Sequence, residues 1–126
     1  MSNPLKIFII DDDPDFVTLL TTVFEMSGHT VLSDCAAVYA LPRIRDEQPD
    51  CILTDLQMSE MDGLEFCKTI RENAATRHAV LIMISAHQNE MWRKKAKDAG
   101  ADGYIVKPID PQTITANVEA IVAGLS

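Results

Sequence analysis

The sequence predicts an α/β fold, namely a doubly wound five-stranded parallel sheet in the order 2-1-3-4-5 with five helices. Continuous apolar runs without alternation recur along the chain, as expected of parallel strands that are covered on both faces. Amphipathic helical patterns lie between these runs, and right-handed crossovers between alternating strands and helices build such a sheet. The chain has 126 residues, 47% of them hydrophobic, which predicts one globular domain over residues 1–126 with a core from about 6 to 123.

Five segments are the expected strands. The four clear apolar runs are Ile7–Ile10, Cys51–Leu53, Val80–Ile84 and Tyr104–Val106. A weaker candidate, Thr30–Leu32, is expected at an edge of the sheet.

Helix signals are clearest after the first strand and at the end of the chain. Apolar residues recur at helical spacing at Phe16, Leu19, Leu20 and Val23. Asp13 is placed to cap this helix, Pro14 stands at its first position and Gly28 lies beyond its end. The last helix follows Pro111, with a stripe of Ile114, Val118, Ile121, Val122 and Leu125.

The second helix is expected within Ala37–Asp46, and it contains a proline. Pro42 cannot donate its amide hydrogen, and its ring clashes with the preceding turn. We therefore expect this helix to begin late, with Pro42 in its first turn, or to be kinked there.

Net charge restricts the partners. A formal charge of −8 argues against nucleic acid binding, which needs a basic surface, although Arg93, Lys94, Lys95 and Lys97 form one local basic run. The N-terminus carries no secretory signal, and no apolar stretch approaches the length of a membrane span. We expect a soluble cytoplasmic protein without membrane contact.

The three cysteines, Cys35, Cys51 and Cys67, are odd in number and lack CxxC spacing. Cys51 and Cys67 fall in apolar runs, so buried free thiols are the favoured interpretation. A redox or metal role is the less favoured alternative.

Reactive side chains stand where four of the strands stop. They are Asp11, Asp12, Asp55, Ser85 and Lys107. The ends of parallel strands lie along one edge of a sheet, so these residues are expected to converge. In a flavodoxin-like order the crevice opens between strands 1 and 3, next to Asp12 and Asp55. Three carboxylates, a hydroxyl and an ammonium suit metal-assisted handling of a phosphoryl group.

Four motifs together resemble the receiver domain of bacterial two-component response regulators, the chemotaxis regulators among them. They are Asp11-Asp12-Asp13-Pro14, the stretch from Thr54 to Gly63, Ile84-Ser85-Ala86, and the stretch from Tyr104 to Pro108. The likeness runs from Lys6 to about Ala123. It implies a domain that accepts a phosphoryl group from a histidine kinase or histidine phosphotransfer protein and signals to a downstream protein target or output domain.

The resemblance implies a role for each site residue. Asp55 is the phosphoacceptor, and a carboxylate can attack phosphorus to form an aspartyl phosphate. Asp11, Asp12, Asp55 and the backbone carbonyl of Gln57 bind Mg²⁺, with Mn²⁺ as an alternative, and neighbouring carboxylates do need a cation before a phosphoryl group approaches. Ser85 and Lys107 contact the phosphoryl oxygens, and the Lys107–Pro108 peptide bond is cis.

Switching in this family couples Ser85 to Tyr104. Movement of the hydroxyl toward phosphate makes space for the aromatic ring, which alters the surface of helix 4, strand 5 and helix 5. That surface would contact protein partners, and a homodimer through it stays open. A half-buried tyrosine without a switching role is the alternative. The chain would not be an enzyme in the usual sense, since it would catalyse only its own phosphorylation and dephosphorylation.

Several positions depart from the family pattern or vary within it. Ser59 stands where proline is usual, so the loop after Asp55 is expected to be looser. Gln57 and His87 flank the path of the hydrolytic water. For His87 an exposed side chain without a role is favoured over a pH-sensitive gate. Trp92 either packs against the domain or, if exposed, anchors a partner.

Three other functions compete with this interpretation. An aspartate-nucleophile phosphohydrolase commonly has a second acid two residues after the nucleophile, where this chain has Gln57. A flavodoxin-like cofactor carrier needs a loop that donates amides to phosphate after strand 1, where this chain has three acids. A docking or dimerisation module without phosphotransfer is the third. A stand-alone regulator and a receiver that belongs to a longer protein are both compatible with the sequence.

Overall fold

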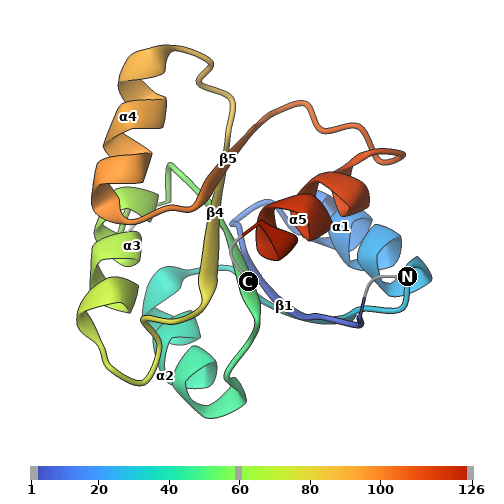
Figure 1. Ribbon diagram of the computed structural model, residues 1–126, viewed down its shortest axis with the longest axis horizontal. Helices are drawn as coiled ribbons and strands as arrows, with labels where there is room; N and C mark the ends of the chain where they lie inside the picture. Colours follow the sequence, from blue (N-terminus) through green and yellow to red (C-terminus); the bar gives the residue numbers. More distant parts are fainter. Residues whose placement is uncertain (1–2, 59–60, 125–126) are drawn as a thin grey trace.

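The structure, a computed structural model, describes residues 3–58 and 61–124 and contains a five-stranded parallel sheet in the order β2-β1-β3-β4-β5 (Figure 1). The strands are β1 (Lys6–Ile10), β2 (Thr30–Asp34), β3 (Cys51–Asp55), β4 (Val80–Ser85) and β5 (Gly103–Val106). All five predicted strands are present, and the predicted order is confirmed.

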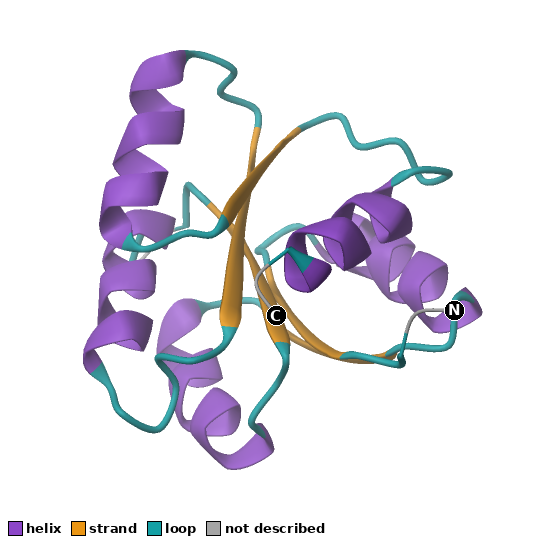
Figure 2. Ribbon diagram, viewed as in Figure 1, coloured by secondary structure: helices purple, strands orange, loops and turns teal. Residues whose placement is uncertain are grey.

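Five helices cover the two faces of the sheet: α1 (Pro14–Met26), α2 (Ala37–Glu47), α3 (Gly63–Glu72), α4 (Glu90–Ala99) and α5 (Ile114–Ala123). Helices α1 and α5 lie on one face, and α2, α3 and α4 lie on the other (Figures 1 and 2). The fold is therefore doubly wound, as predicted.

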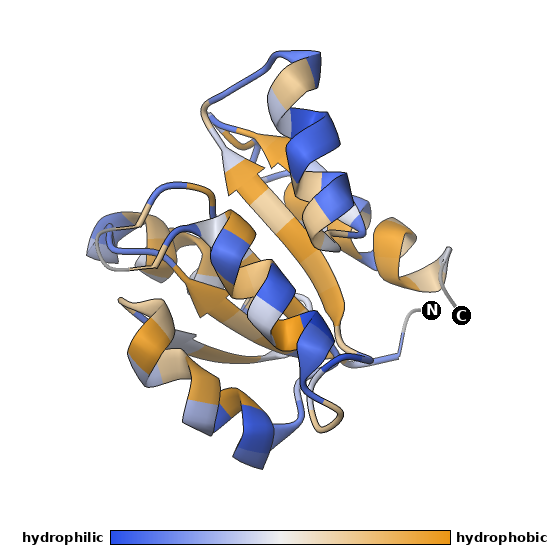
Figure 3. Ribbon diagram, turned by 90° about the vertical axis from the view of Figure 1, so that its left-hand side faces the viewer, coloured by the Kyte–Doolittle hydropathy of each residue, from blue (hydrophilic) through white to orange (hydrophobic). Residues whose placement is uncertain are grey.

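The core is divided by the sheet into two apolar layers. Alternate residues of β1 enter different layers, with Phe8 and Ile10 facing α2 and α3 while Ile7 and Ile9 face α1 and α5. All four side chains are buried. The burial of both faces explains why the central strands are continuously apolar, and apolar residues accordingly fill these strands in Figure 3.

The ends of α1 follow the predicted signals. The Asp13 carboxylate accepts hydrogen bonds from the amides of Asp15 and Phe16, and Pro14 is the first helical residue. Gly28 follows the helix with a φ of 90°, a conformation that favours glycine. In the last helix, Ile114 and Val118 are buried as predicted, whereas Leu125 lies outside the described residues.

The prediction that the second helix begins late is wrong. Helix α2 starts at Ala37, so Pro42 lies inside it. Burial of Ala37, Ala40 and Ile44 against the sheet stabilises the helix from its first turn, and this packing outweighs the hydrogen bond that Pro42 cannot donate to the Val38 carbonyl. Val38, the residue whose carbonyl receives no hydrogen bond from Pro42, is 39% exposed.

Cys51 and Cys67 are buried free thiols, as predicted, and Cys35 is an exposed free thiol. Burial raises the pKa of both the Cys51 and the Cys67 thiols to about 12. Within residues 3–58 and 61–124, no helix combines the length and the apolar character that crossing a membrane requires.

Candidate functional site

The candidate site lies at the edge of the sheet where β1, β3, β4 and β5 end. Strands β1 and β3 are neighbours, and Ile10 pairs with Thr54, so the two residues that follow them, Asp11 and Asp55, come side by side. The chain leaves β1 and β3 toward opposite faces of the sheet, which is the place where ligands bind in open α/β folds. The predicted meeting of Asp12 and Asp55 at this point is confirmed.

Three carboxylates meet there. Oxygen atoms of Asp11, Asp12 and Asp55 lie within 4.8 Å of one another. Asp11 is only 3% exposed, Asp55 is half-buried and Asp12 is exposed. Several carboxylate oxygens at this spacing are a donor set that suits a hard divalent cation such as Mg²⁺.

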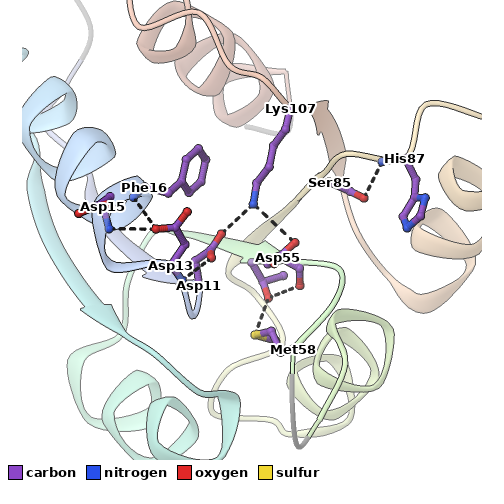
Figure 4. Close-up of polar contacts among 10 residues, drawn as sticks. Asp11, Asp13, Asp15, Phe16, Asp55, Met58, Ser85, His87 and Lys107 are labelled. Atoms are coloured by element: carbon purple, nitrogen blue, oxygen red, sulfur yellow. Dashed lines mark hydrogen bonds and ion pairs between the residues drawn. The ribbon is translucent and has the colours of Figure 1, made fainter.

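Lys107 reaches two of these carboxylates, Asp11 and Asp55, from the end of β5 (Figure 4). Its Nζ donates a hydrogen bond to Asp11 Oδ2 at 3.1 Å and lies 3.8 Å from Asp55 Oδ1. It also lies 4.4 Å from the centre of the Phe16 ring. The Lys107–Pro108 peptide bond is cis, as the resemblance implied.

The pKa of Asp55 is raised above its usual value. Burial is the main cause, and the negative charge of Asp11 adds to it. Lys107 and the backbone amides of Gln57 and Leu56 act in the opposite direction. A cation beside this carboxylate would therefore favour the ionised form, which is the form that can act as a nucleophile.

Close packing restrains the loop that leaves Asp55. The Gly63 amide donates a hydrogen bond to the Leu56 carbonyl at 2.8 Å. A Cβ atom at Gly63 would collide with the Asp55 carbonyl oxygen and would lie 2.9 Å from Met83 Sδ. Gln57 is exposed two residues after Asp55. Ser59, where a looser loop was expected, lies outside the described residues.

Ser85 and Tyr104 are joined through the backbone of one residue, His87. The Ser85 hydroxyl accepts a hydrogen bond from the His87 amide at 3.0 Å, and it points toward that amide in Figure 4. The Tyr104 hydroxyl donates to the His87 carbonyl at 2.8 Å. Residues that the resemblance paired directly are thus connected by the β4–α4 loop.

The side chain of His87 is half-buried, so the expectation of an exposed histidine is wrong. Its ring stacks on Trp92 in α4, with 4.9 Å between the ring centres and 23° between the planes. Trp92 is itself half-buried and packs against the domain, as one of its two predicted roles required. The only sequence signal for this contact is the spacing of His87 and Trp92, two aromatic side chains that lie five positions apart at the start of a helix.

The fold and the site define a doubly wound α/β domain with a cluster of three carboxylates and a lysine at one edge of its sheet. The sequence profile of the response regulator receiver domain matches residues 7–119. The chain therefore belongs to the response regulator receiver family of two-component signalling.

Individual relatives agree with this assignment. The alkaline phosphatase synthesis transcriptional regulatory protein PhoP of Bacillus subtilis is 33% identical over 93% of this chain, which spans 48% of PhoP. Protein PilH of Pseudomonas aeruginosa is 29% identical over 94% of this chain and 98% of PilH. The chain thus spans about half the length of one relative and nearly all of the other.

A solved structure is similar as well. The two-component response regulator of the LuxR family from an Aurantimonas species is 30% identical, with a TM-score of 0.87 over 97% of this chain and 87% of that one.

Proposed function

We propose that this receiver domain accepts a phosphoryl group on Asp55 from a phosphohistidine donor and passes the change to protein partners through α4, β5 and α5. The observation that carries the proposal is the meeting of Asp11, Asp12 and Asp55 within 4.8 Å, with Lys107 Nζ 3.1 Å from Asp11 and 3.8 Å from Asp55. Response regulator receivers interact with histidine kinases and with output or target proteins. The proposal has the same order, with a phosphohistidine donor before Asp55 and protein partners after it.

The transfer step forms one bond and breaks another. An oxygen of the Asp55 carboxylate attacks phosphorus, and the bond between phosphorus and the donor imidazole nitrogen breaks. The electron pair of that bond returns to the imidazole nitrogen, which takes up a proton from solvent water. Lys107 pairs with a phosphoryl oxygen, and the Ser85 hydroxyl donates a hydrogen bond to another after it leaves the His87 amide.

The residues fit a magnesium ion. Asp11, Asp12 and Asp55 would supply carboxylate oxygens and Gln57 a backbone carbonyl, and Mn²⁺ has the same preference for oxygen. When bound, the metal neutralises negative charge on the carboxylates and on the phosphoryl oxygens. Because the same residues serve water attack on the acyl phosphate, the domain also catalyses its own dephosphorylation, but it turns over no separate substrate.

The donor would approach over an apolar surface beside Asp55. A cavity of about 400 Å³ lies between α1 and the loop after β5, and its lining includes Phe16, Leu19, Lys107, Pro108 and Ile109. Leu19 is 40% exposed there. Because Lys107 lines this cavity and also contacts Asp11 and Asp55, a helix of the donor packed on the apolar surface would bring its phosphohistidine to Asp55.

Two measurements on the full chain test this function. Phosphoramidate, a small P–N phosphodonor, should add one phosphoryl group to the wild type in the presence of Mg²⁺ and none to Asp55→Asn, as measured by intact mass. Beryllofluoride with Mg²⁺, which imitates the acyl phosphate, should shift NMR signals around Ser85, His87 and Tyr104 in the wild type only.

Each competing function predicts a different result. Absence of both responses, or the same beryllofluoride response in Asp55→Asn, would support a docking module without phosphotransfer. Continuous release of inorganic phosphate from small phosphate esters at about 1 s⁻¹ or faster would support a phosphohydrolase.

A further inference from the structure

Positive charge is concentrated on one helix of an acidic chain. The formal net charge is −8, yet α4 holds four of the eleven Lys and Arg residues. They are Arg93, Lys94, Lys95 and Lys97. Lys94 forms an ion pair with Asp98 at 3.0 Å, whereas no acid pairs with the other three within the described part of the chain. Helix α4 therefore presents unneutralised positive charge to solvent.

Two cavities adjoin this helix and share a wall. The first, of about 400 Å³, lies between α4 and the start of β5, and Arg93, Lys97 and Tyr104 line it. The second, of about 520 Å³, lies between β5 and α5, and Arg93, Tyr104, Ile105 and Ile121 line it. The Arg93 guanidinium carbon lies 5.0 Å from the centre of the Tyr104 ring, which forms the shared wall. We call the two cavities together the α4–α5 groove. Strand β5 is an edge strand, so no further strand covers the groove.

The two sides of the groove differ in chemistry. The α4 side carries Arg93 and Lys97, whereas the other side is mainly apolar. Its apolar lining residues are Ile105, Val106, Pro108, Ile109, Ile114, Ala120 and Ile121, and its polar ones include Asp110 and Asn117. Two acids line the groove. Asp102 accepts from Arg71 at 2.6 Å and from the Leu81 amide at 3.0 Å, whereas the exposed Asp110 accepts from the Gln112 amide at 2.9 Å. The groove thus offers two cations and an apolar surface, and Asp110 is the acid of its lining that no cation pairs with among the described residues.

This composition decides between partners. In a symmetric dimer the groove of one copy would lie against the groove of the other, and each copy would offer Asp110 as the unpaired acid for the two groove cations, Arg93 and Lys97, of the other copy. A symmetric homodimer through α4, β5 and α5, which the sequence left open, is therefore disfavoured. Nucleic acid would match the cations but would leave the apolar side uncovered. A protein segment with both acidic and apolar side chains matches both sides.

We propose that the α4–α5 groove binds a partner segment in which acidic side chains pair with Arg93 and Lys97 while apolar side chains pack against Tyr104 and Ile121. The inference rests on the proposed function, since it gives a partner chemistry to the surface that phosphorylation is proposed to switch. The contacts of His87 supply the connection, because its carbonyl holds Tyr104 and its ring holds Trp92 of α4.

Three short peptides test the chemistry on the full chain by NMR titration. The first alternates Glu with Leu, the second has Lys in place of Glu, and the third has Ser in place of Leu. The Glu–Leu peptide should shift amide signals of α4, β5 and α5, and it should bind about tenfold more tightly than either of the others. Its affinity should fall with rising salt. Equal binding of the Lys–Leu peptide, or shifts that map elsewhere, would overturn the proposal.

A pair of double variants tests the residues. Arg93→Gln with Lys97→Gln should weaken binding of the Glu–Leu peptide about tenfold. Arg45→Gln with Lys68→Gln removes the same charge from exposed positions of α2 and α3 and should leave binding unchanged. Equal losses in the two variants would mean that only net charge matters, and the proposal would fail. It would also fail if beryllofluoride produced a symmetric dimer through the groove, or if a single-stranded oligonucleotide bound there more tightly than the peptide.

The beryllofluoride response separates this inference from the proposed function. A normal response in the Arg93 and Lys97 variant, combined with lost peptide binding, shows a folded domain with an intact phosphoacceptor and supports the groove. Peptide binding by a wild type that does not respond to beryllofluoride would support the groove and reject phosphorylation. A normal response without peptide binding by the wild type would reject the groove alone.

Discussion

Lys107 donates a hydrogen bond to Asp11 at 3.1 Å, although 96 positions separate the two residues in sequence. Asp11 is 3% exposed, and an unpaired charge at such a site would be costly. The ammonium also lies 3.8 Å from Asp55. Lys107 therefore neutralises two of the three carboxylates that a divalent cation would neutralise, and the two cations compete electrostatically.

Replacement of Lys107 by methionine tests this competition. We expect Lys107→Met to lower the free energy of unfolding without metal by about 1–3 kcal/mol, because Asp11 loses its charged partner. We also expect Mg²⁺ to stabilise the variant more than the wild type, because the metal then meets no competing ammonium. Urea denaturation with and without Mg²⁺ measures both effects. Lys68→Met, at an exposed position of α3, is the matched control. If Mg²⁺ raised the free energy of unfolding by the same amount in the wild type and in Lys107→Met, the competition would be contradicted.

The chain's single tryptophan reports the proposed switch. Trp92 stacks on His87, whose carbonyl accepts the Tyr104 hydrogen bond. Beryllofluoride with Mg²⁺ should therefore change Trp92 fluorescence in the wild type. Tyr104→Phe removes only the hydroxyl and should reduce that change, and Asp55→Asn should abolish it. A change of the same size in Tyr104→Phe would show that the His87 carbonyl does not carry the coupling.

The apolar surface beside Asp55 should matter only to a protein donor. Leu19→Glu places a charge in that surface, and we expect phosphotransfer from a histidine kinase that phosphorylates the wild type to slow about tenfold. Phosphorylation by phosphoramidate should be unchanged, since a small donor does not use the surface. Met26→Glu, 83% exposed at the far end of α1, is the control. Slower reaction with both donors would indicate damage to the site instead of lost docking.

The three thiols should differ sharply in reactivity. Cys35 is exposed and should react with a disulfide reagent within the native state, whereas Cys51 and Cys67 should react only after unfolding. Cys35→Ser should therefore leave no fast thiol, which a thiol titration with and without denaturant measures. A second fast thiol in the native state would contradict the burial.

The same thiols make stability depend on alkaline pH. In the unfolded chain a thiol ionises near its ordinary pKa of 9.0, whereas burial raises the pKa of Cys51 and Cys67 to about 12 and keeps both protonated up to that pH. The contribution of these two protonated thiols to the free energy of unfolding is fully present below pH 9 and should be lost as pH rises from about 9 to 12. Cys51→Ala with Cys67→Ala should flatten this part of the pH profile, as measured by urea denaturation.

The local sequence predicted the central strands better than the edges. Val80–Ile84 is apolar at every position because both faces of β4 are buried. At the edge, β2 extends to Ser33 and Asp34, which pair with Ile9 and Ile10 although their side chains are polar. An edge strand needs less apolar surface, so its end cannot be read from hydrophobicity.

Two predictions, the late start of α2 and the exposed His87, are wrong for the same reason, which is packing in the tertiary structure. The start of α2 before Pro42 depends on burial of Ala37 against the sheet, and the half-buried position of His87 depends on Trp92. Local propensity includes neither packing partner. The usual behaviour of a proline and of a loop histidine therefore gives the wrong prediction here, because the surrounding structure overrides it.

The sequence by itself determined which chemical groups stand at the strand ends, because apolar runs stop at Asp11, Asp55, Ser85 and Lys107. Only the tertiary structure decided that Lys107 bonds Asp11 more closely than Asp55, and that the His87 backbone joins Ser85 to Tyr104. The physical reason is range. A strand end is set by neighbouring residues along the chain, whereas the choice of partner for a charge or hydroxyl depends on distances across strands that the sheet order brings together.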